Sequence, residues 1–282
     1  MKNVWCVGDS WTKGLGSEFE PGSGAIEQSF KKTEEFKKLD CYEFSYPGYL
    51  QKLLGNDYLV KNYGFGGGSN FQIFKDIISI ITHSEKNGFK KGDIMIVGFT
   101  SIVREPLPFF KMSREDFEQG TDFSIKALEK GHRDWYPRWC QIIEHKELKN
   151  AAEKSYEDFL VNRLNYEFLH EQVMNYICQL QIIFETLGIG YLFFNAFENV
   201  ISKNCKPYPH IKKDKWVLFD YTISDYLCDI EPTLDQSLPY SVWEDDVKNV
   251  GRNNDGPHPN RIGYKIISDL IYKNLKEKNV IR

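Results

Sequence analysis

The sequence lacks the features that mark several large classes of protein. It has no run of about 18 apolar residues, so we expect no membrane span. Its six cysteines include no C-x-x-C pair, the usual spacing of a zinc or redox site. The net charge is -4 and the short lysine runs lie beside acidic residues, so we expect no nucleic-acid partner. No apolar leader precedes the first strand pattern, which favours a cytoplasmic protein.

What the chain does have is a globular composition and an alternation of strand and helix patterns. Hydrophobic residues make up 41% and charged residues 27% of the 282 positions, which suits a packed core. The patterns predict strands at 3–8, 58–63, 93–98 and 191–195. They predict helices at 46–55, which ends at the cap residue Gly55, at 71–82 and at 260–278. The last of these has Ile262, Ile266, Ile267, Leu270 and Ile271 on one apolar stripe. Strands separated by helices predict an α/β fold with a doubly wound parallel sheet, and we expect one domain over residues 1–282.

The predicted third and fourth strands are separated by an unusually long stretch, residues 100–188. A plain crossover between parallel strands needs far fewer residues, so we expect a helical insertion there. Residues 150–187 have the pattern of one long helix or two, and residues 104–149 that of an irregular or helical cap. The segment 131–139 is rich in tryptophan and arginine and suits either a glycan-stacking lid or simple packing of the cap.

A serine directly follows the first predicted strand, in the sequence Gly8-Asp9-Ser10. Ligands of doubly wound sheets bind at the carboxyl ends of the strands, so Ser10 would lie where chemistry is expected. At the start of a helix, free N–H groups favour the negative charge that a serine nucleophile develops. The alternative is that Ser10 only caps the helix.

A second group of polar residues lies near the other end of the chain, just before the last predicted helix. A serine nucleophile needs a base, usually histidine, and the imidazole needs a carboxylate on its other nitrogen. Asp255 lies three residues before His258, with glycine and proline between them. A tight loop of this kind can bring the carboxylate back to the ring, although His258 could also be an ordinary turn histidine.

Together, Gly8-Asp9-Ser10 and Asp255-x-x-His258-Pro259-Asn260 resemble the motifs of the SGNH (GDSL-like) hydrolase superfamily. The resemblance implies a three-layer α/β/α, flavodoxin-like fold and a catalytic triad of Ser10, Asp255 and His258. It also implies hydrolysis of esters, among them acetyl groups on sugars, acyl lipids and thioesters. The two motifs lie at opposite ends of the chain, as they do in that family.

A glycine-rich segment after the second predicted strand, residues 62–67, fits a further motif of the family. By this resemblance, the N–H groups of Gly67 and Ser10 stabilise the oxyanion, a large contribution to catalysis in acyl transfer. The competing interpretation is a nucleotide site. The segment has no lysine of a P-loop and no third glycine of a dinucleotide fingerprint, so we favour the oxyanion hole.

The chain departs from the family after the third predicted strand, where G-x-N-D is usual. Gly98-Phe99-Thr100-Ser101 stands there, with Thr100 in the place of an asparagine that donates to the oxyanion. We expect the Thr100 hydroxyl to take over, or Ser101 or Asn70 to substitute. The candidate substrate-binding residues are Asp9, Asn70, Ser101 and Arg104, of which Arg104 suits an anionic group.

The sequence therefore predicts a serine esterase that acts through an acyl-serine intermediate. The favoured substrate is an O-acetyl or similar short acyl ester of a carbohydrate, either a small molecule or a glycan. No metal and no organic cofactor is required. One alternative is an acyltransferase that uses the same intermediate, and another is a non-catalytic glycan-binding or structural protein. The oligomeric state is not indicated by the sequence.

Overall fold

The computed structural model describes residues 1–17, 41–66, 68–102, 165–230 and 258–281. Its centre is a parallel sheet of four strands in the order β2-β1-β3-β4. The strands are β1 (Lys2–Gly8), β2 (Tyr58–Gly64), β3 (Ile94–Phe99) and β4 (Gly190–Asn195). Each lies within a residue or two of a strand predicted from the sequence, because long apolar runs bounded by glycine and polar residues are a strong signal.

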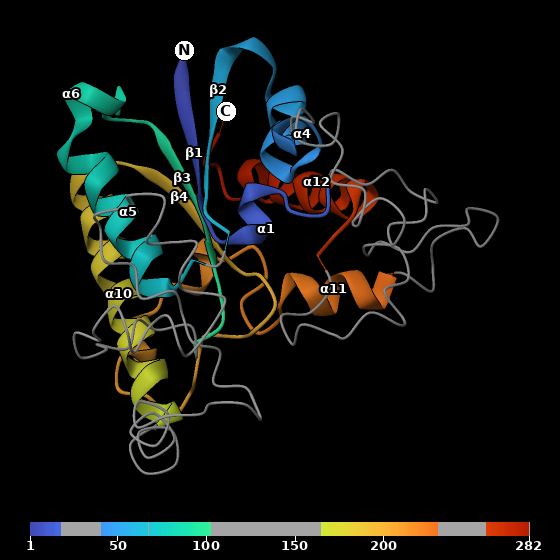
Figure 1. Cartoon of the computed structure of the whole chain (residues 1–282). Helices are drawn as coiled ribbons and strands as arrows, with labels where there is room; N and C mark the ends of the chain where they lie inside the picture. Colours follow the sequence, from blue (N-terminus) through green and yellow to red (C-terminus); the bar gives the residue numbers. More distant parts are fainter. Residues whose placement is uncertain (18–40, 67, 103–164, 231–257, 282) are drawn as a thin grey trace, which may run out of the picture.

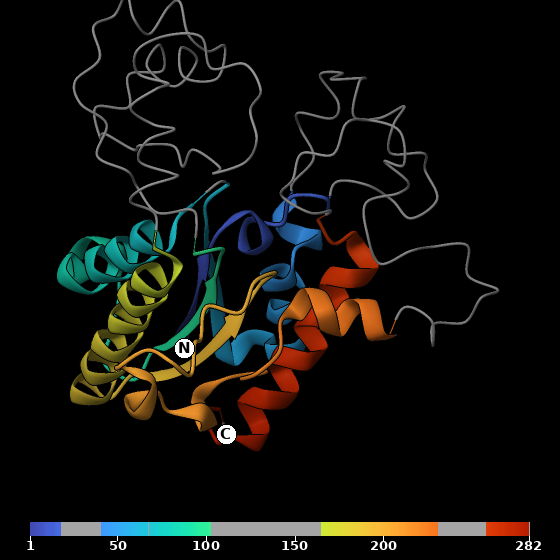
Figure 2. The ribbon, with the colours of Figure 1, turned by 90° about the horizontal axis from the view of Figure 1, so that it is seen from below.

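Helices cover both faces of this sheet (Figures 1 and 2). One face carries α5 (Asn70–Thr82) and α10 (Tyr166–Leu187). The other carries α4 (Tyr46–Leu54) and α12 (Arg261–Glu277), which pack against each other as well as on the sheet. The described part of the chain is therefore α/β with three layers. None of its helices is long and apolar enough to cross a membrane.

Alternate strand residues fill two separate cores, one on each side of the sheet. On β1, Trp5 and Val7 face α5 and α10, whereas Val4 and Cys6 face α4 and α12. All four are fully buried, and the same alternation continues along β3 and β4. A strand buried on both faces must be apolar at every position, which explains the continuous hydrophobic runs in the sequence.

The main helices begin at side chains that cap their first turn. Ser45, Ser69, Asn165 and Asn260 precede α4, α5, α10 and α12, and each accepts a hydrogen bond from a main-chain N–H two or three residues later. Such caps satisfy N–H groups that the helix itself leaves unpaired. The shorter helices are α1 (Ser10–Lys13), α3 (Cys41–Phe44), α6 (Ser84–Asn87), α11 (Ile223–Ile230), η2 (Gly55–Asp57), η3 (Tyr208–His210) and η4 (Lys213–Lys215).

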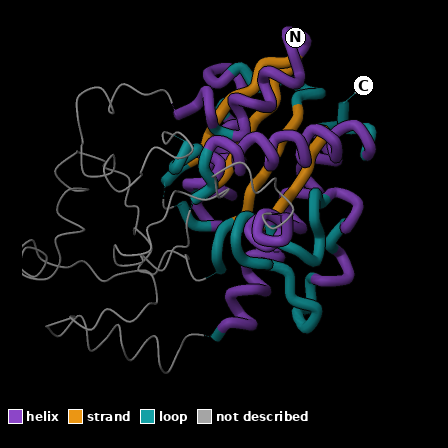
Figure 3. The backbone as a smooth tube through the Cα atoms, turned by 90° about the vertical axis from the view of Figure 1, so that its right-hand side faces the viewer, coloured by secondary structure: helices purple, strands orange, loops and turns teal. Residues whose placement is uncertain are grey.

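Two details differ from the sequence-based expectation. The last helix was expected to bury Ile262 and Ile266, but these are only partly buried, and its core positions are Tyr264, Ile267, Ile271 and Leu275. Of the insertion expected at 100–188, only the ends are described. Residues 166–187 form α10, the crossover helix between β3 and β4, and residues 103–164 lie outside the described residues. The backbone of the described chain, coloured by secondary structure, is shown in Figure 3.

The outer edge of β2 is covered by side chains rather than by another described strand. Gln51 of α4 accepts from the Val60 N–H at 2.8 Å and donates to the Tyr58 carbonyl at 3.1 Å. The Tyr42 hydroxyl of α3 donates to the Val60 carbonyl at 2.8 Å. These bonds satisfy main-chain groups that an edge strand otherwise presents to its surroundings.

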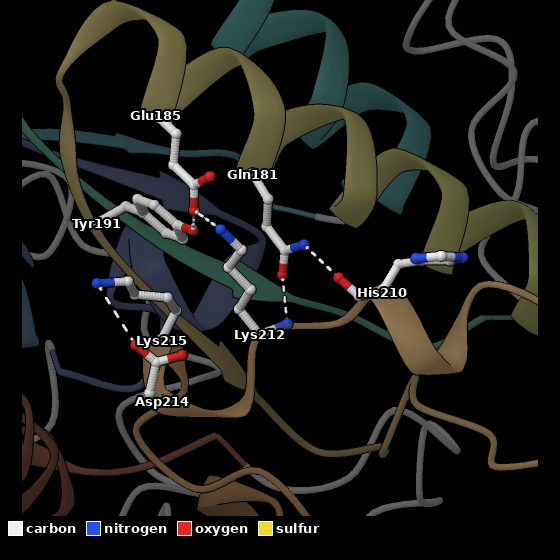
Figure 4. Close-up of polar contacts among 7 residues, drawn as sticks. All are labelled: Gln181, Glu185, Tyr191, His210, Lys212, Asp214 and Lys215. Carbon is white, nitrogen blue, oxygen red and sulfur yellow. Dashed lines mark hydrogen bonds and ion pairs between the residues drawn. The ribbon is translucent and has the colours of Figure 1, made fainter.

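The chain after β4 is fastened to α10 by a cluster of polar contacts (Figure 4). Gln181 donates to the His210 carbonyl and accepts from the Lys212 N–H, both at 2.9 Å. Glu185 accepts from the Lys212 ammonium and from the Tyr191 hydroxyl. The hydrogen bond from Lys212 is the main reason why the pKa of Glu185 lies below its ordinary value. This cluster lies at the amino ends of the strands and therefore serves the fold.

The strand order fixes where a ligand site is expected. From β1 the chain crosses one face of the sheet through α4 to reach β2, and it returns over the other face through α5 to β3. The connections thus diverge between β1 and β3, and the space beyond the carboxyl ends of two such strands is where doubly wound proteins bind ligands. Ser10 follows β1 and Thr100 follows β3.

Candidate active site

The serine of interest begins a single helical turn at the end of β1. Asp9 precedes this turn, and its carboxylate accepts a hydrogen bond from the Trp11 N–H at 3.0 Å. The helix cap is therefore Asp9, and the alternative that Ser10 serves as the cap is wrong. The Ser10 hydroxyl is left available for other contacts. Ser10 is 4% exposed, so it lies just below the surface.

Two glycines let this turn lie against the ends of β1 and β2. A Cβ atom on Gly8 would fall 2.2 Å from the Thr12 hydroxyl oxygen, and one on Gly64 would fall 2.0 Å from the Lys13 nitrogen. Both distances are far inside van der Waals contact, so only glycine fits. The sequence around Ser10 thus builds a tightly seated turn whose position is fixed by the strands beneath it.

His258 approaches Ser10 from the far end of the chain. Its Nε2 atom lies 2.9 Å from the Ser10 Oγ atom, although the two residues are 248 positions apart in sequence. His258 is partly buried and lies just before α12, whose cap Asn260 accepts from the N–H groups of Ile262 and Gly263. The histidine is therefore carried on the end of a well-capped, rigid helix, within hydrogen-bond distance of the serine.

Thr100 also meets the serine turn, though not in the expected way. Its hydroxyl donates to the second carboxylate oxygen of Asp9 at 2.9 Å. Asp9 is 1% exposed, and with Trp11 on one oxygen and Thr100 on the other, its carboxylate joins β1 to the end of β3. A hydroxyl has one proton, so donation to an oxyanion would require Thr100 to rotate away from Asp9. That role stays a prediction.

Asn70, at the start of α5, is completely buried against the same segment. Its amide donates to the carbonyls of Thr100 and Ser101, each at 3.1 Å, and its oxygen accepts from the Thr100 N–H at 2.9 Å. With one amide proton for each carbonyl, both donor positions of the side chain are used by these bonds. Asn70 and Asp9 therefore position the loop after β3, and contact of either with a substrate stays a prediction.

Three predicted site residues, Gly67, Arg104 and Asp255, lie outside the described residues. Their neighbours show where part of the glycine segment runs. The Phe65 N–H donates to the Gly8 carbonyl at 2.9 Å, and a Cβ on Gly68 would lie 3.8 Å from the Cα of Asp9. The chain on both sides of position 67 is thus held beside the serine turn.

Buried, uncharged side chains lie beneath the serine turn. Burial raises the pKa of the Cys6 thiol and of the Tyr46 hydroxyl, so both groups keep their protons. The Tyr46 hydroxyl donates to Thr12 at 3.3 Å, and all three side chains are buried. Cys6 is therefore not a thiolate nucleophile, although it lies only four residues before Ser10.

Among the described residues, no three His, Cys, Asp or Glu side chains gather as ligands of a metal would. The structure places His258 beside Ser10, as the sequence analysis expected. The roles of Asp9 and Asn70 as structural links were not expected. A buried asparagine next to the cap of α5 carries no sequence signal that separates such a role from ligand binding.

Comparison with solved structures finds distant likenesses. A psychrotrophic esterase from a Pseudoalteromonas species matches with a TM-score of 0.42 and 10% identity over 98% of both chains. A putative lipolytic protein of the G-D-S-L family from Desulfitobacterium hafniense matches with a TM-score of 0.37 and 13% identity, over 98% of this chain and 100% of that one. A carbohydrate acetylesterase family member from Sinorhizobium meliloti matches with a TM-score of 0.37 and 15% identity, over 100% of both chains. No family model and no curated protein sequence matches the chain.

Proposed function

We propose that the chain hydrolyses a carboxylic ester, with Ser10 as the nucleophile and His258 as its general base. The observation that carries the proposal is the 2.9 Å separation of the Ser10 Oγ and His258 Nε2 atoms at the carboxyl end of the sheet. A base must be within hydrogen-bond reach of the proton that it removes, and this pair meets that condition. The likenesses to known esterases are too distant to add weight.

The proton path follows from the chemistry of imidazole. Neutral His258 accepts the Ser10 proton on Nε2 as the hydroxyl attacks the ester carbonyl, and it later passes that proton to the leaving alcohol. The Nδ1 atom carries a proton throughout, and a carboxylate partner on it holds this tautomer and stabilises the imidazolium. Asp255 takes this role in the proposal because it lies three residues before His258. Water then releases the acyl group from Ser10, with His258 again as the base.

The oxyanion that forms in each step requires preorganised donors. The proposal assigns this role to the main-chain N–H groups of Ser10 and Gly67. Phe65 is bonded to the Gly8 carbonyl and Gly68 lies close to Asp9, which supports that assignment. A site with two donors instead of three would be slower, since one donor is typically worth about 10²–10³ in kcat.

The proposed substrate is a short acyl ester, with an O-acetyl group on a carbohydrate favoured. This preference comes from the tryptophan- and arginine-rich segment at 131–139, whose side-chain types suit stacking on sugar rings. A small acyl group also suits a serine that is only 4% exposed.

The proposal is tested by substituting the nucleophile in the full chain. Ser10→Ala leaves the helix cap intact because Asp9 is the cap, so the variant should fold normally. We expect the turnover of 4-nitrophenyl acetate to fall by roughly 10⁴-fold or more. Labelling by a fluorophosphonate probe should be lost as well. Ser79→Ala, which removes an exposed hydroxyl from α5, is the matched control and should behave as the unmodified chain does.

Each result points to a different function. If Ser10→Ala keeps the rate of the unmodified chain, Ser10 is not the nucleophile and the proposal is wrong. If the unmodified chain is neither labelled nor active, a binding or structural protein is favoured. If acetyl groups pass to a glycan acceptor faster than acetate appears, the chain is an acyltransferase.

A further inference from the structure

The first turn of α12 is fastened to the chain that leaves the serine turn, residues 14–17, which we name the exit turn. The Tyr264 hydroxyl donates to the Leu15 carbonyl at 2.6 Å. The Arg261 Nε–H donates to the Ser17 carbonyl at 2.9 Å. These bonds join segments almost 250 residues apart in sequence, immediately beside both proposed catalytic residues.

The contact is buried and is supported from several sides. Tyr264 is 0% exposed, and Ser17 is equally buried, with its hydroxyl bonded to the Gly14 carbonyl at 2.5 Å. The Arg261 guanidinium lies over the ring of Phe44 in α3, 3.8 Å from the ring centroid. A cation held over an aromatic face and bonded through its Nε–H has little rotational freedom. The exit turn and α12 therefore meet in a fixed geometry.

The bonds continue from the exit turn directly to the nucleophile. The Ser10 carbonyl accepts from the N–H groups of Gly14 and Leu15, at 3.0 and 3.1 Å. The peptide plane of Ser10 is thus connected through Leu15 to the Tyr264 hydroxyl. On the other side, His258 lies three residues before Arg261, next to the cap of the same helix. A short path of hydrogen bonds, continued by the main chain of α12 and its cap, therefore connects the nucleophile with the base.

We propose that Arg261 and Tyr264 are positioning residues that set the distance between Ser10 and His258. This inference rests on the proposed esterase function, since the distance matters only if the two residues react together. A hydroxyl and an imidazole 2.9 Å apart transfer a proton readily, and a displacement of about 1 Å can cost about 10²-fold in rate. Neither residue belongs to the proposed triad or to the proposed oxyanion hole.

A merely structural role of these bonds predicts different measurements from a positioning role. If the bonds only add stability, their loss lowers the melting temperature and leaves kcat of the folded protein unchanged. If they set the distance, kcat falls while KM and the circular dichroism spectrum stay the same. Ser268 provides a matched control because it lies one turn further along α12, is fully buried, and has a hydroxyl with no hydrogen-bond partner among the described residues.

The test compares Tyr264→Phe, Arg261→Met and Ser268→Ala in the full chain, with 4-nitrophenyl acetate as the substrate. We expect kcat to fall by about 10-fold to 10²-fold for the first two variants, with KM within twofold. Ser268→Ala should stay within twofold in both constants. The imidazole resonances of His258, identified with His258→Gln, should shift in Tyr264→Phe and Arg261→Met and not in Ser268→Ala.

The outcomes separate this inference from the proposed function. Folded Tyr264→Phe and Arg261→Met variants with unchanged kcat and unchanged His258 resonances would overturn the positioning role. If the unmodified chain hydrolyses no ester, the proposed function fails, while the resonances still show whether the two residues fix His258. If Tyr264→Phe does not fold, Arg261→Met decides, because the Arg261 side chain is only partly buried whereas Tyr264 is completely buried.

Discussion

Replacing Thr100 by valine removes one hydroxyl group while the shape of the side chain is kept. The hydroxyl donates to a carboxylate oxygen of Asp9, which is almost completely buried. Hydrogen bonds to charged groups contribute about 1.5–3 kcal/mol to stability, so Thr100→Val should lower the free energy of unfolding by about that amount. In a chain of this length the melting temperature should fall by roughly 3–5 °C.

The same variant separates two roles of the hydroxyl. If Thr100 donates to the oxyanion in place of the missing asparagine, kcat should fall by about 10-fold to 10²-fold. If it serves only to hold Asp9, kcat of the folded enzyme should change less than that, and the loss should appear in stability. Thr100→Ser keeps the donor and should restore most of the rate in either case.

Thermal unfolding and a double-mutant cycle with Asp9→Asn measure the bond itself. Because the two side chains are in direct contact, we expect a coupling free energy of about 1–2 kcal/mol between the substitutions. A melting temperature of Thr100→Val equal to that of the unmodified chain, together with no coupling, would show that the bond to Asp9 contributes nothing.

Two further predictions concern buried and half-buried acids away from the site. Asp93 accepts hydrogen bonds from the main chain of Asn3 and Lys90 and from the side chains of Asn3 and Trp5. Asp93→Asn should therefore destabilise the fold by about 1.5–3 kcal/mol in chemical unfolding. The kcat of this variant should be unchanged, because Asp93 lies at the amino ends of the strands, and a fall in kcat would contradict a purely structural role. Burial raises the pKa of Asp76, so the folded state binds its proton more tightly and stability should increase as the pH falls through the raised folded pKa. Asp76→Asn should remove this increase from the pH dependence of the melting temperature, and an unaltered profile would assign it to other groups.

The strands and main helices could be predicted because their signals are local. The continuous apolar runs at 94–99 and 190–195 mark strands buried on both faces, and Gly55 follows α4 as the pattern indicates. The pairing of Ser10 with His258 was predicted from two motifs and the general rule that strand ends carry sites. It is the strongest agreement between the sequence and the described geometry.

The polar links around the site could not be predicted in this way. Asp9 was a candidate for substrate binding only, and its roles as the cap of α1 and as the acceptor for Thr100 were not expected. The donor from which a carboxylate accepts a hydrogen bond depends on the distance between β1 and β3 and on side-chain rotamers. Neither can be read from the spacing of residues along the chain. Tyr264 was missed for the same reason, since a tyrosine on the buried side of a helix has the same pattern whether or not its hydroxyl bonds to a distant carbonyl.

The covering of β2 by Gln51 and Tyr42 has a consequence for how copies of this protein can meet. Sheets of two molecules often join when their border strands exchange main-chain hydrogen bonds, and here the groups of Tyr58 and Val60 that would take part are already engaged. Continuous sheets across two subunits are therefore disfavoured at this border. Association through strand pairing, including the early steps of aggregation, would have to use main-chain groups other than these.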